Sequence, residues 1–383
     1  MRRSIGIALW FALLFGTTLL LRRDLVWSPA ARFDESVLLQ AFAAVERGQS
    51  PYSVPAFYYP PPFAVLGGAL CKALGEPGFL LFLRLGSVLG ASLIGLLAVR
   101  VTRWPLWVQV PVSLLVAGPS IPIGAAIGSG NVNPLIQGMA LLALALVAGA
   151  PVFAGLLLGL SVALKPAAAA LVPLLIVYRP GGSPAPRISG LVAAATTGLL
   201  LAFCRPQEIP AMLARGSDIF PSDHNLSLAR IFGYVGVTIP SGLIFAVIVG
   251  GAAWWIARRQ PARGAFDAVA TSASVLSLPM IWPHGLALTF PTQCLALDGT
   301  GDRGSFRGRM FFWLALAAVI GIEGSAGGGA TEVEWPGWVK SLVGALPLAA
   351  VVLVTALAVR RERRRQRVAG ELRVAGQVLV PDA

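Results

Sequence analysis

Residues 106–127 read LWVQVPVSLLVAGPSIPIGAAI and contain no charged side chain. Two further stretches have the same character: IGIALWFALLFGTTLLL at residues 5–21 and SLVGALPLAAVVLVTALAV at residues 341–359. A helix that crosses the hydrocarbon core of a bilayer needs about 20 apolar residues. Each stretch therefore has the length of a membrane span or nearly so, and we expect an all-α, polytopic membrane protein.

The composition of the whole chain agrees with this expectation. Of its 383 residues, 56% are hydrophobic and 12% are charged, whereas an ordinary soluble domain carries about 25% charged residues. Too little polar surface exists to cover a globular protein in water. We expect about ten to thirteen transmembrane helices in a single membrane domain, 1–383. Because Pro166 interrupts the stretch 152–178, broken half-helices are the alternative there.

The formal net charge of +13 comes from cations in short loops and in a C-terminal tail. That placement indicates topology rather than nucleic-acid binding. The positive-inside rule assigns the basic segments to the cytoplasm; they are 179–187, 258–263, 303–309 and 360–383. We expect a multi-pass plasma-membrane protein with both termini cytoplasmic. Residues 1–21 form the first span, because Leu20-Leu21-Arg22-Arg23 offers no small-residue signal-peptide cleavage site.

This orientation places residues 22–58 outside, before the remaining spans in 59–359. Apolar residues recur at helical spacing from Phe33 to Val45, which predicts an amphipathic helix along the membrane surface. Asp34 and Glu35 lie at its start, where a helix dipole favours anions whether or not they react. Tyr58 and Tyr59 suit an interfacial aromatic belt before the next span.

Few other polar residues interrupt the apolar segments, and each has a structural alternative. Lys165 is either a compact cation that suits a phosphate or a lysine that snorkels near a helix end. Asn131 and Asn133 either cap the following helix or contact a ligand. Further candidates lie in loops expected outside: His224, Asn225, Arg230 and His284.

The sequence contains no zinc-type cluster of His, Cys and Asp, no Walker loop and no convincing dinucleotide fingerprint. We therefore expect no cofactor, no divalent metal, and no nucleotide-driven chemistry.

Several segments together resemble the C-type glycosyltransferases that depend on polyprenyl phosphates, most closely glycosyltransferase family 87, which includes mannosyl- and arabinofuranosyltransferases. The more specific matches are Phe33-Asp34, Gly48-Gln49-Ser50-Pro51-Tyr52 and Tyr59-Pro60-Pro61-Pro62-Phe63. Weaker matches are Gly130-Asn131-Val132-Asn133, where Asn131 replaces the family's glutamine, the Gly-rich segment 155–166 ending in Lys165-Pro166, His224-Asn225-Leu226-Ser227-Leu228, and Pro283-His284.

The resemblance implies a C-type glycosyltransferase fold with an active site on the external face. It implies transfer of a sugar from a polyprenyl-phosphate donor to a lipid- or glycan-linked acceptor, with membrane lipids as further partners. Asp34 would then be the general base, with Glu35 in reserve, and Lys165 would bind the donor phosphate. His284 would orient a substrate or share the proton. Tyr58, Tyr59, Asn131, Asn133, His224, Asn225 and Arg230 become candidates for substrate contacts.

Two alternatives to an enzyme remain open at this stage. A transporter or flippase of lipid-linked sugars would also use broken helices and cations near the membrane midplane. A non-catalytic membrane subunit would explain the departure at Asn131.

Overall fold

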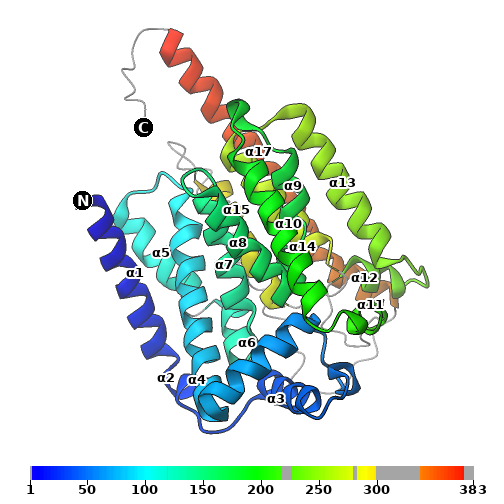
Figure 1. Cartoon of the computed structure of the whole chain (residues 1–383). Helices are drawn as coiled ribbons and strands as arrows, with labels where there is room; N and C mark the ends of the chain where they lie inside the picture. Colours follow the sequence, from blue (N-terminus) through cyan, green and yellow to red (C-terminus); the bar gives the residue numbers. More distant parts are fainter. Residues whose placement is uncertain (1, 119, 218–226, 279–282, 299–336, 375–383) are drawn as a thin grey trace.

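The computed structural model describes residues 2–118, 120–217, 227–278, 283–298 and 337–374. These residues form helices joined by short connections, without a β-strand among them (Figure 1). The α-helices are α1 (Arg2–Leu21), α2 (Arg23–Val26), α3 (Phe33–Glu46), α4 (Pro61–Arg100), α5 (Leu106–Ala117), α6 (Ile121–Ser129), α7 (Asn133–Leu146), α8 (Pro151–Leu164), α9 (Leu171–Val177), α10 (Ala185–Phe203), α11 (Ile209–Ser217), α12 (Leu228–Gly233), α13 (Ser241–Arg259), α14 (Arg263–Leu276), α15 (Phe290–Leu297) and α17 (Gly337–Val374). Short 3₁₀ turns are η1 (Pro51–Ser53), η2 (Pro166–Ala168), η3 (Pro180–Gly182), η4 (Pro206–Glu208) and η5 (Pro283–Thr289).

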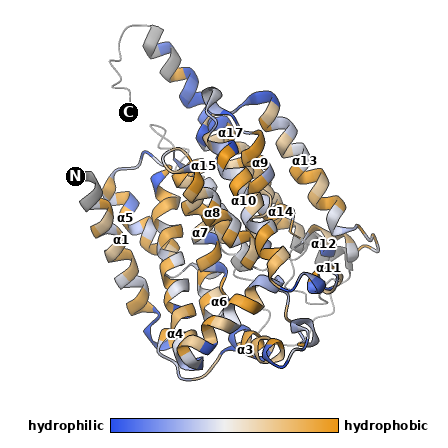
Figure 2. Cartoon of the chain, viewed as in Figure 1, coloured by the Kyte–Doolittle hydropathy of each residue, from blue (hydrophilic) through white to orange (hydrophobic). Residues whose placement is uncertain are grey.

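Four helical stretches are long and apolar enough to cross a membrane within the described part of the chain: Pro61–Arg100, Leu106–Ser129, Ala185–Phe203 and Ser241–Arg259. Shorter apolar helices lie beside them at Gly6–Leu21, Asn133–Leu146, Pro151–Leu164 and Pro166–Val177. Figure 2 shows that hydrophobic residues cover most of the length of these helices. The all-α membrane architecture is confirmed. The expected number of spans stays a prediction, because one expected span, 310–322, lies outside the described residues.

Close helix packing in this bundle depends on small residues. The approach of α4 to α7 is the clearest case: a Cβ added at Gly138 would lie 2.7 Å from the Cα of Gly90, and one added at Gly90 would lie 2.1 Å from the carbonyl oxygen of Pro134. No larger side chain fits between these backbones. Apolar helices gain little from the hydrophobic effect inside a lipid phase, so close packing of this kind carries their association.

The structure shows how three parts of the expected span pattern are built. The stretches 63–74 and 79–99 belong to one helix, α4, which bends at Gly75 (φ +70°) two residues before Pro77. In Figure 1 its first part lies across the α3 end of the bundle and its second part runs along the bundle. The stretch 152–178 is broken at Lys165, as the half-helix alternative expected, because Pro166 has no N–H to continue α8.

The third part is the stretch 286–297. Only Phe290–Leu297 is α-helical, and Pro283–Thr289 before it forms the 3₁₀ turn η5. Pro291 stands in the first turn of α15, where a residue without an N–H is tolerated. This segment is therefore too short to cross a membrane as one α-helix.

Helix α3 forms where the amphipathic pattern predicts it and lies at one end of the bundle (Figure 1). Its apolar face is buried against the first part of α4 rather than left for lipid. Phe42 is 3% exposed, and its ring lies where a Cβ at Gly67 would stand, 2.5 Å from the nearest ring atom. The rings of Phe63 and Phe79 pack on it, with centroids 6.2 and 5.2 Å away. Helix α3 is thereby fixed to the rest of the domain.

Candidate active site

A chain of three side chains connects α3, the loop before α7 and the break after α8. The Nδ2 of Asn131 donates to Oδ2 of Asp34 across 3.1 Å. The Nζ of Lys165 donates to Oδ1 of the same amide across 3.0 Å. Residues separated by up to 131 positions in the sequence thus meet, with Asn131 between a carboxylate and an ammonium.

Local structure determines where each of the three lies. Helix α3 begins after Arg32, whose backbone N–H donates to the Glu35 side chain across 2.9 Å, so Asp34 falls in the first turn. Lys165 ends α8 in an extended conformation (φ −158°) directly before Pro166, which turns its side chain out of the helical path. Both positions follow from residues that begin or end helices: Glu35 bonds the backbone at the start of α3, and Pro166 ends α8 directly after Lys165.

The backbone of Asn131 is fixed by the end of α6, and its side-chain amide is oriented by the charged groups of Asp34 and Lys165. Gly130, in a left-handed conformation (φ +77°), ends α6, and the Asn131 backbone N–H donates to the Ala126 carbonyl across 2.8 Å. The orientation of its amide is set by chemistry, because an ammonium only donates and a carboxylate only accepts. Its Oδ1 also accepts the backbone N–H of Asn133 across 3.0 Å. Asn131 therefore caps the start of α7 and bridges the site at the same time.

Aromatic and amide groups complete the walls of the site. The Lys165 Nζ lies 4.7 Å from the ring centroid of Tyr59, a cation–π distance. Burial first, and the charge of Asp34 second, raise the pKa of the Tyr59 hydroxyl well above its usual value, so the phenol stays protonated and can donate. This hydroxyl and the Oδ1 of Asn133 are two of several buried side-chain polar atoms without a hydrogen-bond partner among the described residues; others include Thr18 and Tyr178, away from the site. Such orphan groups cost about 1–3 kcal/mol each and are typical of a site that a ligand completes.

Glu35 differs from the expectation that it contacts substrate. Its side chain is 1% exposed, and Arg84 from α4 donates to both of its oxygens, from Nε across 2.9 Å and from Nη2 across 2.7 Å. Arg32 approaches the same carboxylate at 3.8 Å. Arg84 also donates to the Ser28 and Ala30 carbonyls ahead of α3. Glu35 thus fixes the start of α3 and leaves Asp34 as the carboxylate that faces Asn131.

Sequence reasoning did not select Arg84. A signal was available, because it is an arginine inside the apolar stretch 79–99, and a buried cation in a membrane domain needs a partner. Its partner lies 49 residues earlier in the chain, so the pair itself could not be recognised without the fold.

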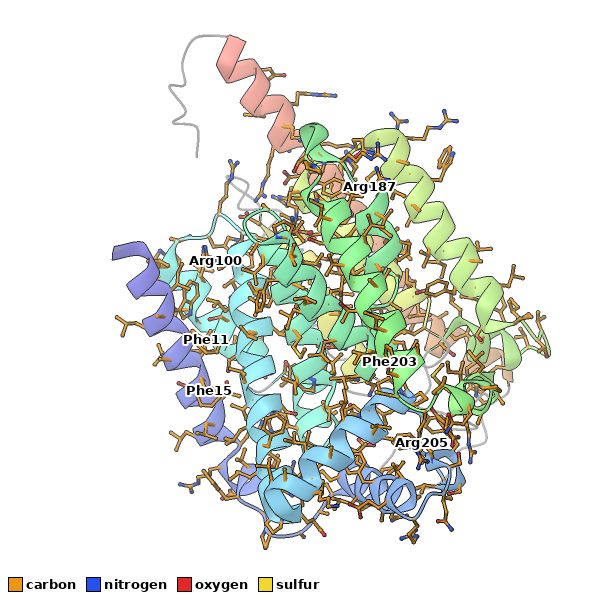
Figure 3. The ribbon with its side chains drawn as sticks, viewed as in Figure 1. Phe11, Phe15, Arg100, Arg187, Phe203 and Arg205 are labelled. Carbon is orange, nitrogen blue, oxygen red and sulfur yellow. The ribbon has the colours of Figure 1, made fainter. Side chains whose placement is uncertain are left out.

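The segment 48–52 (Gly-Gln-Ser-Pro-Tyr) supports the site from one side. The Tyr52 hydroxyl donates to the Tyr59 carbonyl across 2.9 Å, which links this segment to the segment 59–63 (Tyr-Pro-Pro-Pro-Phe). The Ser50 hydroxyl donates to Glu208 across 2.5 Å, and Arg205, which Figure 3 labels beside α3, donates to the Gln49 carbonyl across 2.6 Å. These contacts therefore join the expected external loop 22–58 to the segment that follows α10.

The remaining predicted residues are placed less closely. Tyr58 is half-buried beside Tyr59. Arg230 lies on α12, with its guanidinium 4.6 Å from the ring centroid of Tyr234. The backbone of His284 is in η5 rather than in a simple turn, and the next residue, Gly285, accepts a hydrogen bond from Gln137 of α7 across 3.2 Å. The His284 side chain, like His224 and Asn225, lies outside the described residues.

No group of three His, Cys, Asp or Glu side chains that could hold a metal ion occurs in the part of the chain that the structure describes. A surface groove of about 680 Å³ lies beside the ends of α1 and α2, lined by Arg23, Asp24 and Trp27 among others. It includes none of the residues that meet around Asn131.

A comparison with known protein families shows to which family the chain belongs. The model of glycosyltransferase family 87 matches residues 57–281, which include Tyr59, Asn131 and Lys165 but not Asp34 or His284. No curated protein matches the chain. The family match covers more than half of the 383 residues, and it agrees with the helical membrane architecture. The chain is a membrane protein that belongs to glycosyltransferase family 87.

Proposed function

We propose that this glycosyltransferase transfers mannose or arabinofuranose from a polyprenyl-phosphate donor to a lipid- or glycan-linked acceptor on the external face of the membrane. The observation that supports the proposal is the Asp34–Asn131–Lys165 chain, which brings a carboxylate and an ammonium to one place with an amide between them. A lipid-linked donor suits such a site, because the isoprenoid can lie between apolar helices.

The proposed reaction is a single displacement. The acceptor hydroxyl gives its proton to the free oxygen of Asp34 while its own oxygen forms a bond to the anomeric carbon. The bond between that carbon and the phosphate oxygen breaks, and its electron pair leaves with polyprenyl phosphate. Attack from the face opposite the leaving group inverts the anomeric centre. One carboxylate suffices, whereas glycoside hydrolysis uses two.

Lys165 is proposed to stabilise the charge that develops on the departing phosphate. Only one of its three N–H groups is used by Asn131, and the cation faces the ring of Tyr59. The protonated Tyr59 hydroxyl is a second candidate donor to the phosphate or the sugar. The proposal includes no divalent metal, so activity should survive a chelator such as EDTA.

Asn131 is proposed to act as a spacer. With its amide removed, Asp34 and Lys165 could approach and neutralise each other. With it in place, one carboxylate oxygen is engaged by Nδ2 and the other is available to the acceptor. This role differs from a direct substrate contact.

The test is donor use by the purified full-length chain in detergent. It would be supplied in turn with polyprenyl-phosphate mannose, polyprenyl-phosphate arabinofuranose and the corresponding nucleotide sugars, with a glycolipid acceptor, and products would be identified by mass spectrometry. Product from a polyprenyl-phosphate sugar supports the proposal. Equal use of a nucleotide sugar contradicts the donor assignment, and no turnover with any donor favours a non-catalytic subunit.

A further inference from the structure

The arginine-rich part of α17, after the apolar stretch 341–359, has two different faces. On one face, Arg361 donates to the Ala296 carbonyl across 3.0 Å and Arg365 forms an ion pair with Asp298. The Asp298 carboxylate also accepts the backbone N–H of Arg103 across 2.6 Å. This face ties α17 to α15 and to the loop after α4, so its arginines have structural partners within the bundle.

The other face carries four exposed arginines: Arg360, Arg363, Arg364 and Arg367. Their spacing of i, i+3, i+4 and i+7 places them on one side of the helix, and we call them the arginine face. Like charges at this spacing repel one another, so an anionic partner would relieve a cost that the helix otherwise carries.

Tryptophans on α13 border the arginine face. Arg363 lies over the ring of Trp255, 5.9 Å from its centroid, and Arg258 lies over Trp254, 5.6 Å from its centroid. Trp254 is 63% exposed. Figure 2 shows hydrophilic residues over the end of α13 and along α17 at the end of the bundle opposite α3, directly after hydrophobic helix. Tryptophan next to cations at such a boundary is typical of the headgroup level of a bilayer.

We propose that the arginine face binds the headgroups of anionic phospholipids. Guanidinium groups match phosphate oxygens in pairs of hydrogen bonds, and the exposed Leu353 and Leu357, one to two turns earlier on α17, are placed to contact acyl chains. A cation near an anionic membrane surface contributes about 1 kcal/mol, or about fivefold in binding. The inference does not depend on the proposed transferase activity, because it uses another end of the molecule.

The test is a lipid titration of the full-length chain in neutral detergent. Apparent dissociation constants for phosphatidylglycerol and for phosphatidylcholine would be measured by native mass spectrometry. The chain should prefer phosphatidylglycerol, and the pair Arg360→Gln with Arg364→Gln should weaken that binding by about tenfold or more. A matched pair at the α3 end, Arg23→Gln with Arg47→Gln, also removes two exposed cations and should leave it unchanged within about twofold.

A quadruple variant of the arginine face should abolish the preference. Thermal unfolding of each variant in phosphatidylcholine alone checks that the fold is kept, and the double variant carries the test if the quadruple variant unfolds. The proposal is overturned if the unaltered chain binds both lipids equally. It is also overturned if the folded Arg360 and Arg364 variant keeps its preference, or if the matched pair loses it equally.

Discussion

Asn131 donates a hydrogen bond to Asp34 across 3.1 Å, from a loop that follows α6 to the first turn of α3. The same amide accepts from Lys165 on its other side. An amide is neutral and presents a donor and an acceptor in fixed directions, so it can hold a carboxylate and an ammonium near each other without discharging either. On the proposed mechanism, this separation keeps Asp34 available as a base.

Replacing Asn131 tests that role. Asn131→Ala should lower kcat by about 100-fold, because a misplacement of about 1 Å in a catalytic group has effects of that order. Asn131→Gln keeps an amide at this position and should recover most of the loss. Donor binding should change little in either variant. A large rise in KM with unchanged kcat would instead make Asn131 a substrate contact.

Lys165 should act mainly after donor binding. Lys165→Met removes the cation but keeps much of the side-chain volume, and kcat should fall by about 100- to 1,000-fold, as for other groups that stabilise developing charge. Lys165→Arg keeps the charge in a wider, planar group and should retain part of the activity. Kinetics with a saturating donor measure both. If Lys165→Met is as active as the unaltered chain, the phosphate is stabilised elsewhere.

The Glu35–Arg84 pair should contribute to stability rather than to chemistry. Arg84→Ala leaves a buried carboxylate without its main partner and should destabilise the fold by about 3–5 kcal/mol. The double variant Glu35→Ala with Arg84→Ala should lose less, because no isolated charge remains. Thermal unfolding measures both, with Arg23→Ala in the exposed Arg23–Asp24 pair as the control of small effect. If Arg84→Ala and Arg23→Ala have equal melting temperatures, the Glu35–Arg84 pair does not stabilise the fold.

Gly130 should be intolerant of a side chain. Its φ of +77° disfavours other residues, and a Cβ there would lie 2.6 Å from Cγ of Glu35. Gly130→Ala should therefore lower the melting temperature and reduce activity by shifting Asn131. Gly128→Ala is the matched control, since a Cβ at that helical position meets nothing within 4 Å. A Gly130→Ala variant with the stability and activity of Gly128→Ala would show that this loop does not position the site.

Much of this architecture follows from local sequence patterns. The helix from Phe33 and the break at Lys165-Pro166 were predictable, because periodicity and proline act within a few residues. The contacts that make the site were not. Glu35 and Asp34 are adjacent and chemically alike, and only the position of Arg84 on α4 determines which of them is occupied by a structural ion pair.

The number of spans is likewise not fixed by local patterns. Hydropathy finds apolar residues but does not show whether they cross the bilayer, and the first part of α4 packs on α3 through Phe42 and Gly67. The capping contact of Asn131 is local, because its partner Asn133 lies two residues away, but the bridge to Asp34 and Lys165 depends on residues 97 and 34 positions distant and needs the fold.

If Asp34 removes the acceptor's proton, Asp34→Asn should stop transfer without unfolding the chain. Asparagine keeps the shape of the side chain but cannot act as the base, so product formation from a polyprenyl-phosphate sugar should fall by about 100- to 10,000-fold while donor binding and thermal unfolding stay close to those of the unaltered chain. Asp24→Asn, at a carboxylate that is 93% exposed on α2, should be fully active. Unchanged turnover by a folded Asp34→Asn variant would contradict the account.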